Sequence, residues 1–171
     1  SQISIEGKTF KLPEPFFVIA TQNPRDQVGV FDLPESQIDR FSLCINMDIL
    51  NSEDYLKILN EEHMHTEIIN SSYTAISKSV KKVHFDHKLQ VFLLKILDEI
   101  EKVSGKYLAI RPRVQLQNLA KVYAALKSRT FVVPEDILAL LLSSMRHRFH
   151  EMSKHEIERM ILESVSSIKL P

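Results

Sequence analysis

The feature that most constrains the fold is a series of apolar residues at helical spacing, which fills the chain from about residue 51 to its end. The clearest example lies between Asp86 and Gly105, where apolar residues recur every three or four positions and so share one face of a helix. These residues are Leu89, Phe92, Leu93, Ile96, Leu97 and Ile100. Because Asp is a favoured N-cap and Gly a favoured C-terminal stop, both ends of this helix are marked as well.

Further helices are expected in the same part of the chain. Their starts are marked by Asn51 or Ser52, by Pro112, by Pro134 and by a capping box of Ser153 with Glu156. The segment 66–82 is polar and β-branched, which leaves open a loop with one more short helix. The basic run 146–148 is expected in the last turn of the helix that begins at Pro134, where it would complement the helix dipole. Short connections between these helices predict a compact bundle.

The N-terminal residues have a different pattern. Residues 1–15 alternate apolar and polar side chains on both sides of a turn, which predicts a hairpin. Residues 16–21 and 42–47 are predicted as strands, the first buried on both faces, and residues 34–40 as a short helix. Two or three strands and one helix cannot cover both faces of a parallel sheet, so this part is expected to be the end of a larger α/β domain.

The predicted fold class is therefore α+β, with the end of an α/β core followed by an all-α helical bundle. We expect the core part to cover residues 1–48 and the helical domain to cover residues 49–171. The chain begins at Ser1 without an initiator methionine, which suggests a piece excised from a longer protein, although processing would have the same result.

The tripeptide Gly7, Lys8 and Thr9 matches the end of a phosphate-binding loop. The rest of that motif is absent, because Gln2 stands where its first glycine would be and no strand precedes the tripeptide. Two prolines within 10–15 also prevent a helix from following it. A hairpin turn at Glu6 and Gly7 explains this stretch better.

The composition excludes several classes of protein. Lys plus Arg and Asp plus Glu are 22 each, so the formal net charge is zero, which argues against a general binder of nucleic acids or anionic membranes. The single cysteine, Cys44, rules out an internal disulfide and fits a reducing compartment. The apolar runs are far shorter than a membrane span, and no signal-peptide pattern opens the chain. We expect a soluble protein of the cytoplasm.

The histidines raise the question of a metal site. Six of them form close pairs, namely His63 with His65, His84 with His87, and His147 with His150. Zinc sites use such spacings, but no cysteine lies nearby and each pair adjoins charged residues. No metal site is therefore expected.

Three segments together resemble one known family. The first comprises ATQNP at 20–24 and G-x-x-x-L-P-E-x-Q-x-D-R-F at 29–41. The second comprises RPRV at 111–114 with 119–125, and the third VPED at 133–136 with RHR at 146–148. In order and spacing, the chain resembles the C-terminal half of a MoxR-type AAA+ ATPase. Magnesium chelatase ATPase subunits and MCM helicases are weaker matches with the same wider architecture.

The resemblance implies roles for four residues. Asn23 matches sensor 1, an amide that orients the water attacking the γ-phosphate. Arg40 matches the arginine finger, which reaches the nucleotide of the neighbouring subunit. Arg113 matches sensor 2 of the lid, but Arg111 stands where the family usually has a small residue, so either arginine could have that role. The full-length protein would use ATP and Mg, form a homo-oligomeric ring, expected to be a hexamer, and remodel an unknown client protein or insert a metal cofactor.

Simpler interpretations of these residues remain open. Asn23 could cap a turn, Arg40 could pair with Asp39 or Glu35, and Arg113 could be a solvated surface residue. Because these 171 residues contain no complete phosphate-binding loop, the chain alone is expected neither to bind Mg-ATP tightly nor to hydrolyse it. The alternative function is a stand-alone helical interaction or adaptor domain without nucleotide chemistry. A nucleic-acid-binding domain is disfavoured by the neutral charge.

Overall fold

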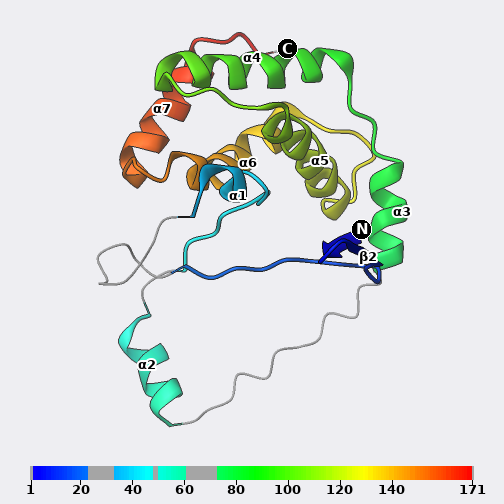
Figure 1. Cartoon of the computed structure of the whole chain (residues 1–171). Coiled ribbons are helices and arrows are strands. Elements are labelled where there is room, and N and C mark those ends of the chain that lie inside the picture. Colours follow the sequence, from blue (N-terminus) through cyan, green and yellow to red (C-terminus); the bar gives the residue numbers. More distant parts are fainter. Residues whose placement is uncertain (1, 23–32, 48–49, 61–72, 171) are drawn as a thin grey trace. The chain divides into compact units, whose positions relative to one another are not determined.

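The structure, a computed structural model, describes residues 2–22, 33–47, 50–60 and 73–170 (Figure 1). It divides into two compact units, Ser1–Leu33 and Pro34–Pro171. The expected boundary between a core part and a helical domain at residue 48 stays a prediction.

The first unit contains a two-stranded antiparallel hairpin. Strand β1 covers Gln2–Ile5 and strand β2 covers Lys8–Lys11, with Ile3 opposite Phe10. The two turn residues have positive φ angles, 49° at Glu6 and 78° at Gly7, as a two-residue hairpin loop requires. The predicted hairpin is confirmed, and the tripeptide that matched a phosphate-binding loop lies in its turn and second strand.

The two strands predicted after the hairpin are not formed. Residues 16–22 and 42–47 have no regular secondary structure, and both carry exposed apolar side chains, such as Ile19 at 90% and Met47 at 93%. A strand needs a neighbour to bond its backbone N–H and C=O groups. Within the described residues, the hairpin is the only sheet, so these apolar segments have no strand beside them.

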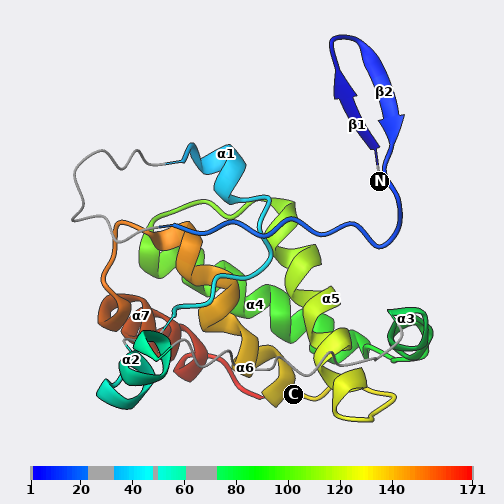
Figure 2. The same cartoon turned by 90° about the horizontal axis from the view of Figure 1, so that it is seen from below.

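The second unit is helical (Figure 2). Its elements are α1 (Glu35–Ile38), α2 (Ser52–Leu59), α3 (Tyr73–Lys81), α4 (His87–Ser104), α5 (Ile110–Leu126), α6 (Pro134–Met145), the 3₁₀ helix η1 (Arg146–Phe149) and α7 (Lys154–Ser166). Helices α4, α5, α6 and α7 pack on one another, and α1 contacts η1. The predicted end of an α/β region followed by a helical bundle is confirmed at this level.

The core lies between α4, α5, α6 and α7, and it follows the apolar periodicity of the sequence. All six apolar residues predicted on one face of α4 are buried, and Ile96, Leu97 and Ile100 are fully so. The Asp86 carboxylate caps this helix by accepting a hydrogen bond of 2.8 Å from the Lys88 amide. Gly105 ends it with a φ of 68°, the left-handed conformation that favours glycine.

Two helix boundaries differ from the prediction. Helix α5 begins at Ile110, so Pro112 occupies its third position, where a missing N–H is tolerated because the first four amides of a helix have no partner within it. The basic run 146–148 lies in the separate 3₁₀ helix η1 after α6. Within η1 the Arg148 side chain is buried, with only 4% of it exposed.

Helix α6 begins at an ion pair that is nearly closed to water. Asp136 is 1% exposed, and its carboxylate accepts hydrogen bonds from Arg129 Nη1 at 2.8 Å and from the Val133 amide at 2.9 Å. Burial alone would raise the pKa of Asp136, but the bonds from Arg129 and Val133 outweigh burial and hold this pKa below its usual value. One carboxylate therefore caps α6 and neutralises an arginine.

Candidate functional site

Three of the four expected site residues lie in the described part of the chain. Asn23 lies outside the described residues, so its assignment to sensor 1 stays a prediction. Arg40, Arg111 and Arg113 are all described and belong to the helical unit.

Arg40 lies in an exposed turn directly after α1. Pro34 precedes this one-turn helix, and the Arg40 amide donates to the Gln37 carbonyl at 3.1 Å. The two carboxylates that could have paired with Arg40 are bound to other cations: Glu35 to Lys106, and Asp39 to Arg148 and Arg111. The turn therefore exposes Arg40 while its acidic neighbours are engaged elsewhere.

The acidic neighbour Asp39 is the point where the α1 turn meets the helical bundle. Its Oδ1 accepts from Nε of Arg148 at 3.0 Å, and its Oδ2 accepts from Nη1 of Arg111 at 3.1 Å. Burial lowers the pKa of Arg148, and the charge and hydrogen bond of Asp39 oppose that effect. Because a guanidinium stays protonated in proteins, Asp39 supplies the charge that makes burial of Arg148 tolerable.

Arg148 has further partners around this carboxylate. Its Nη1 donates to the Ser144 carbonyl, and its Nη2 lies 2.6 Å from Gln115 Oε1 on α5. From the sequence, Arg148 belongs to a matched segment and is expected only to complement a helix dipole. The only available signal was the adjacency of Asp39 to Arg40 in the matched D-R-F triplet, since a buried arginine needs an acid.

The ring of His147 lies beside Arg148. Its Nε2 is 2.9 Å from the Phe41 carbonyl and 2.7 Å from Arg148 Nη1, so in any one tautomer it either donates to the former or accepts from the latter. Burial first, and then the charge of Arg148, lower the pKa of His147 to about 4.

We predict that His147 stays neutral when the pH falls from 8 to 5. The folded pKa lies below the ordinary histidine value of about 6.5, so protons bind the unfolded state more readily and this residue's contribution to stability falls as the pH drops below that value. NMR titration of the ring shifts would check this, with His147→Gln used to assign the signal. A midpoint near 6.5 for His147 would contradict it.

Arg113 is held within the bundle. Its Nη2 bonds to Asp98 at 2.8 Å and to Glu101 at 2.9 Å, both on α4, and its Nη1 donates to the carbonyls of Leu108 and Ala109. Burial opposes the charged form, but these two carboxylates raise the pKa of Arg113 overall. Contact with a phosphate would require Arg113 to give up two ion pairs.

Arg111 differs from Arg113 in both exposure and partners. Its side chain is 50% exposed, and its ion pair with Asp39 is with the residue immediately before Arg40. The structure thus brings Arg111 and the Arg40 turn together. Arg113, on the same helix α5, is bound to α4 instead.

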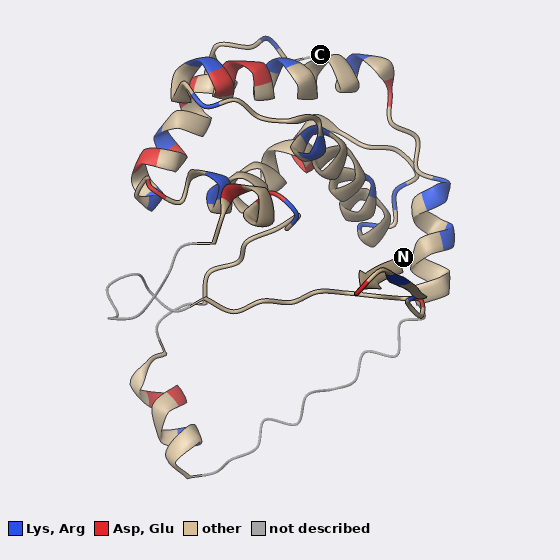
Figure 3. Cartoon of the chain, in the orientation of Figure 1, with Lys and Arg blue, Asp and Glu red and all other residues tan. Residues whose placement is uncertain are grey.

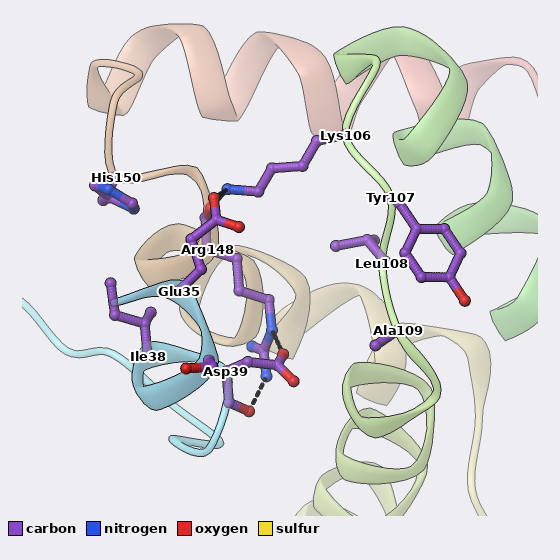
Figure 4. Close-up of a pocket in the computed structure, with 10 residues that line it drawn as sticks. Glu35, Ile38, Asp39, Lys106, Tyr107, Leu108, Ala109, Arg148 and His150 are labelled. Carbon is purple, nitrogen blue, oxygen red and sulfur yellow. Dashed lines mark hydrogen bonds and ion pairs between the residues drawn. The ribbon is translucent and has the colours of Figure 1, made fainter. Parts of the chain in front are cut away.

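A pocket of about 240 Å³ lies beside this turn (Figure 4). It is lined by Glu35, Ser36, Ile38 and Asp39 from the α1 segment, by 106–109 from the connection between α4 and α5, and by Arg148 and His150. Lys106 crosses it, with Nζ bonded to Glu35 and, at 2.9 Å, to the Arg148 carbonyl. The hydrogen bond and charge of Lys106 lower the pKa of Glu35. The charges at the rim of the pocket are thus paired internally.

The described residues offer no cluster of three or more His, Cys, Asp or Glu that could hold a metal ion. His63 and His65 lie outside the part of the chain that the structure describes. Cys44 is partly buried, and its amide donates to the Ser143 carbonyl at 2.8 Å.

Two families of known proteins match this chain, one in its N-terminal quarter and one in the helical unit. Residues 1–43 match the family described as ATPase family associated with various cellular activities (AAA), and residues 107–166 match the AAA lid domain. The second match begins in the connection before α5 and ends in α7, so it contains Arg111, Arg113 and Arg148.

Individual relatives agree with these matches. The chain is 30% identical to the uncharacterized protein YeaC of Bacillus subtilis, over 99% of the chain and 57% of YeaC. It is 28% identical to the chaperone MoxR1 of Mycobacterium tuberculosis, over 85% of the chain and 43% of MoxR1. It is 24% identical to the magnesium-chelatase subunit ChlI of Mesostigma viride, over 85% of the chain and 42% of that subunit.

A solved structure supports the fold. A candidate ATPase from Cytophaga hutchinsonii superposes with a TM-score of 0.73 at 24% identity, over 99% of this chain and 58% of that one. The present chain belongs to the AAA ATPase family and contains its lid domain. Within that family it is of the MoxR type, as the likeness to MoxR1 indicates. It spans about half the length of the curated relatives that it matches.

In the described part of the chain, no helix is long and apolar enough to cross a bilayer. The ribbon in Figure 3, coloured by residue type, shows acidic and basic positions interleaved along α4 and α7.

Proposed function

We propose that this chain is the C-terminal part of a MoxR-like AAA+ ATPase that couples ATP hydrolysis to the remodelling of a protein client or to metal-cofactor insertion. The observation that carries the proposal is the Arg40 turn, in which an exposed arginine follows a short helix while its acidic neighbours are bound by Lys106 and Arg148. The order of the family matches, core segment first and lid second, supports it.

In this proposal the chain contributes one residue to each of two nucleotide sites, its own and that of a neighbouring subunit. Arg40 contacts the nucleotide of a neighbouring subunit, where its guanidinium stabilises charge developing on the transferred phosphoryl group. Asn23 orients the attacking water in its own subunit. ATP and Mg are held mainly by a phosphate-binding loop elsewhere in the full-length protein. That protein acts in the cytoplasm as a homo-oligomeric ring of six subunits, in which the chemistry requires only one neighbouring subunit.

Arg111 is the better candidate than Arg113 for the lid arginine that contacts nucleotide. Arg113 already has two carboxylates and two carbonyls as partners, whereas Arg111 is half exposed and has one carboxylate. Moving Arg111 to a phosphate therefore costs less than moving Arg113. Because Arg111 pairs with the residue beside Arg40, both arginines would face the same nucleotide.

This assignment predicts different outcomes for two substitutions in the full-length protein. Arg111→Ala should lower kcat for ATP hydrolysis about 10-fold or more while the melting temperature stays close to wild type, since only an exposed ion pair is lost. Arg113→Ala should mainly lower the melting temperature, because it leaves Asp98 and Glu101 without their partner. Steady-state ATPase assays and thermal melts check both. A reversed pattern would assign the role to Arg113.

The alternative is a helical interaction or adaptor domain without nucleotide chemistry. The two proposals differ in what the chain alone and the full-length protein can do. We expect no ATPase activity above background from these 171 residues, and activity from the full-length protein that is lost on Asn23→Ala. A full-length protein that neither binds nor hydrolyses ATP would favour the adaptor.

A further inference from the structure

The backbone around Arg40 is held by the lid at three successive carbonyl groups. Arg148 Nη2 lies 3.3 Å from the Asp39 carbonyl and 3.2 Å from the Phe41 carbonyl. Between them, the Arg40 carbonyl accepts from Gln115 Nε2 at 3.3 Å. The donors come from α5 and η1, more than seventy residues along the chain from the groups that they bind.

Gln115 and Arg148 also bind each other. The amide oxygen of Gln115 accepts from Arg148 Nη2 at 2.6 Å, while the amide nitrogen of the same side chain reaches Arg40. Arg148 is anchored at its other end by Asp39 and by the Ser144 carbonyl. The two side chains thus form one connected unit, which we call the carbonyl clamp.

The Arg40 turn needs such support. Helix α1 has only four residues, and a helix this short has little stability of its own. The turn after it is exposed at Arg40, so the position of the guanidinium depends on what holds the backbone beneath it. A displacement of about 1 Å in a catalytic group can cost about 100-fold in rate.

We propose that Gln115 and Arg148 are positioning residues for Arg40, and that the carbonyl clamp makes the reach of Arg40 follow the position of the lid. The inference rests on the proposed function, in which Arg40 acts on a neighbouring subunit's nucleotide. When the lid moves, the turn moves with it, because the donors on α5 and η1 belong to the lid and the acceptors flank Arg40.

The test compares variants of Gln115 in the full-length protein. Gln115→Ala removes both bonds of this side chain, and Gln115→Glu keeps an oxygen for Arg148 but has no N–H for the Arg40 carbonyl. Gln117→Ala is the matched control, since it makes the same change two positions along α5, on another side of the helix. We expect both Gln115 variants to lower kcat about 10- to 100-fold, with KM for ATP changed less than about twofold and Gln117→Ala unchanged.

A mixing experiment shows through which group Gln115 acts. Asn23→Ala subunits have an impaired nucleotide site and an intact Arg40 turn, so mixing them with Gln115→Ala subunits should restore hydrolysis at interfaces where the two meet. A Gln115→Ala loss that this mixture does not rescue would mean that Gln115 serves its own subunit's site, and it would overturn the inference. Unchanged kcat in both Gln115 variants would overturn it too.

The same assays separate this inference from the function on which it rests. Arg40→Ala is measured in parallel. If Arg40→Ala is inactive and the Gln115 variants are fully active, only the carbonyl clamp is rejected. If Arg40→Ala is fully active, the proposed function fails first.

Discussion

Replacing Arg40 by alanine in the proposed full-length ATPase is expected to lower kcat for ATP hydrolysis about 10³-fold while ATP affinity changes little. The reason is that an arginine finger interacts with charge that develops in the transition state, and such an interaction affects the rate more than ground-state binding. Arg40 suits this role because it is exposed, and because Asp39 and Glu35 are already paired with other cations.

Two further variants make the Arg40 result specific. Arg40→Lys keeps the charge but not the planar fork of donors, so it should recover only a small part of the lost rate. Arg159→Ala removes another exposed lid arginine, whose side chain is 74% exposed, and should leave kcat unchanged. Steady-state rates and fluorescent-nucleotide binding are the measurements. Loss of binding together with a lower melting temperature would indicate a folding defect and contradict the role assigned to Arg40.

Replacing Asp136 by alanine is expected to lower the free energy of unfolding of the helical unit by about 3 kcal/mol, which combines the lost charge-assisted bonds with the lost cap of α6. The carboxylate is 1% exposed and serves both Arg129 and the Val133 amide, so alanine leaves two donors without an acceptor. Urea unfolding followed by circular dichroism measures the change. Asp54→Ala is the control: its ion pair with Lys57 at 3.6 Å is exposed, so its removal should cost less than about 1 kcal/mol.

The contribution of Asp136 to the free energy of unfolding should also fall at low pH. Its folded pKa lies below the ordinary aspartate value of about 3.9, so the stabilisation is fully present above that value. It is lost as the pH falls through the folded pKa, because the protonated group no longer pairs with Arg129. The difference between wild type and Asp136→Ala should therefore narrow only below about pH 4. A difference that narrows between pH 7 and 5 would contradict this account.

The helical part of the fold could be predicted because its signals are local. Asp86, Gly105 and the pair of Ser153 with Glu156 mark helix ends within a few residues, and the buried face of α4 follows directly from its spacing. The segments 16–21 and 42–47 could not be predicted in the same way. Their apolar character is that of strands, but a strand also requires a neighbour, which the described residues do not provide.

The surroundings of the expected site residues could not be predicted for a similar reason. The family resemblance pointed to Arg40, Arg111 and Arg113, but local sequence could not show which acids each arginine would meet. Asp39 and Arg148 are 109 residues apart, and only the packing of η1 against α1 brings them together. The carbonyl clamp was missed altogether, because backbone carbonyls leave no mark in a sequence.

The central claim is that the chain contributes to two nucleotide sites, its own through Asn23 and a neighbour's through Arg40. Mixing Asn23→Ala and Arg40→Ala subunits of the full-length protein tests it most directly, because each variant alone should be inactive. In a ring of head-to-tail interfaces, random mixing at equal amounts leaves about a quarter of the interfaces with an intact Asn23 site facing an intact Arg40, so about a quarter of wild-type activity should return. A mixture no more active than its separate components would contradict the claim.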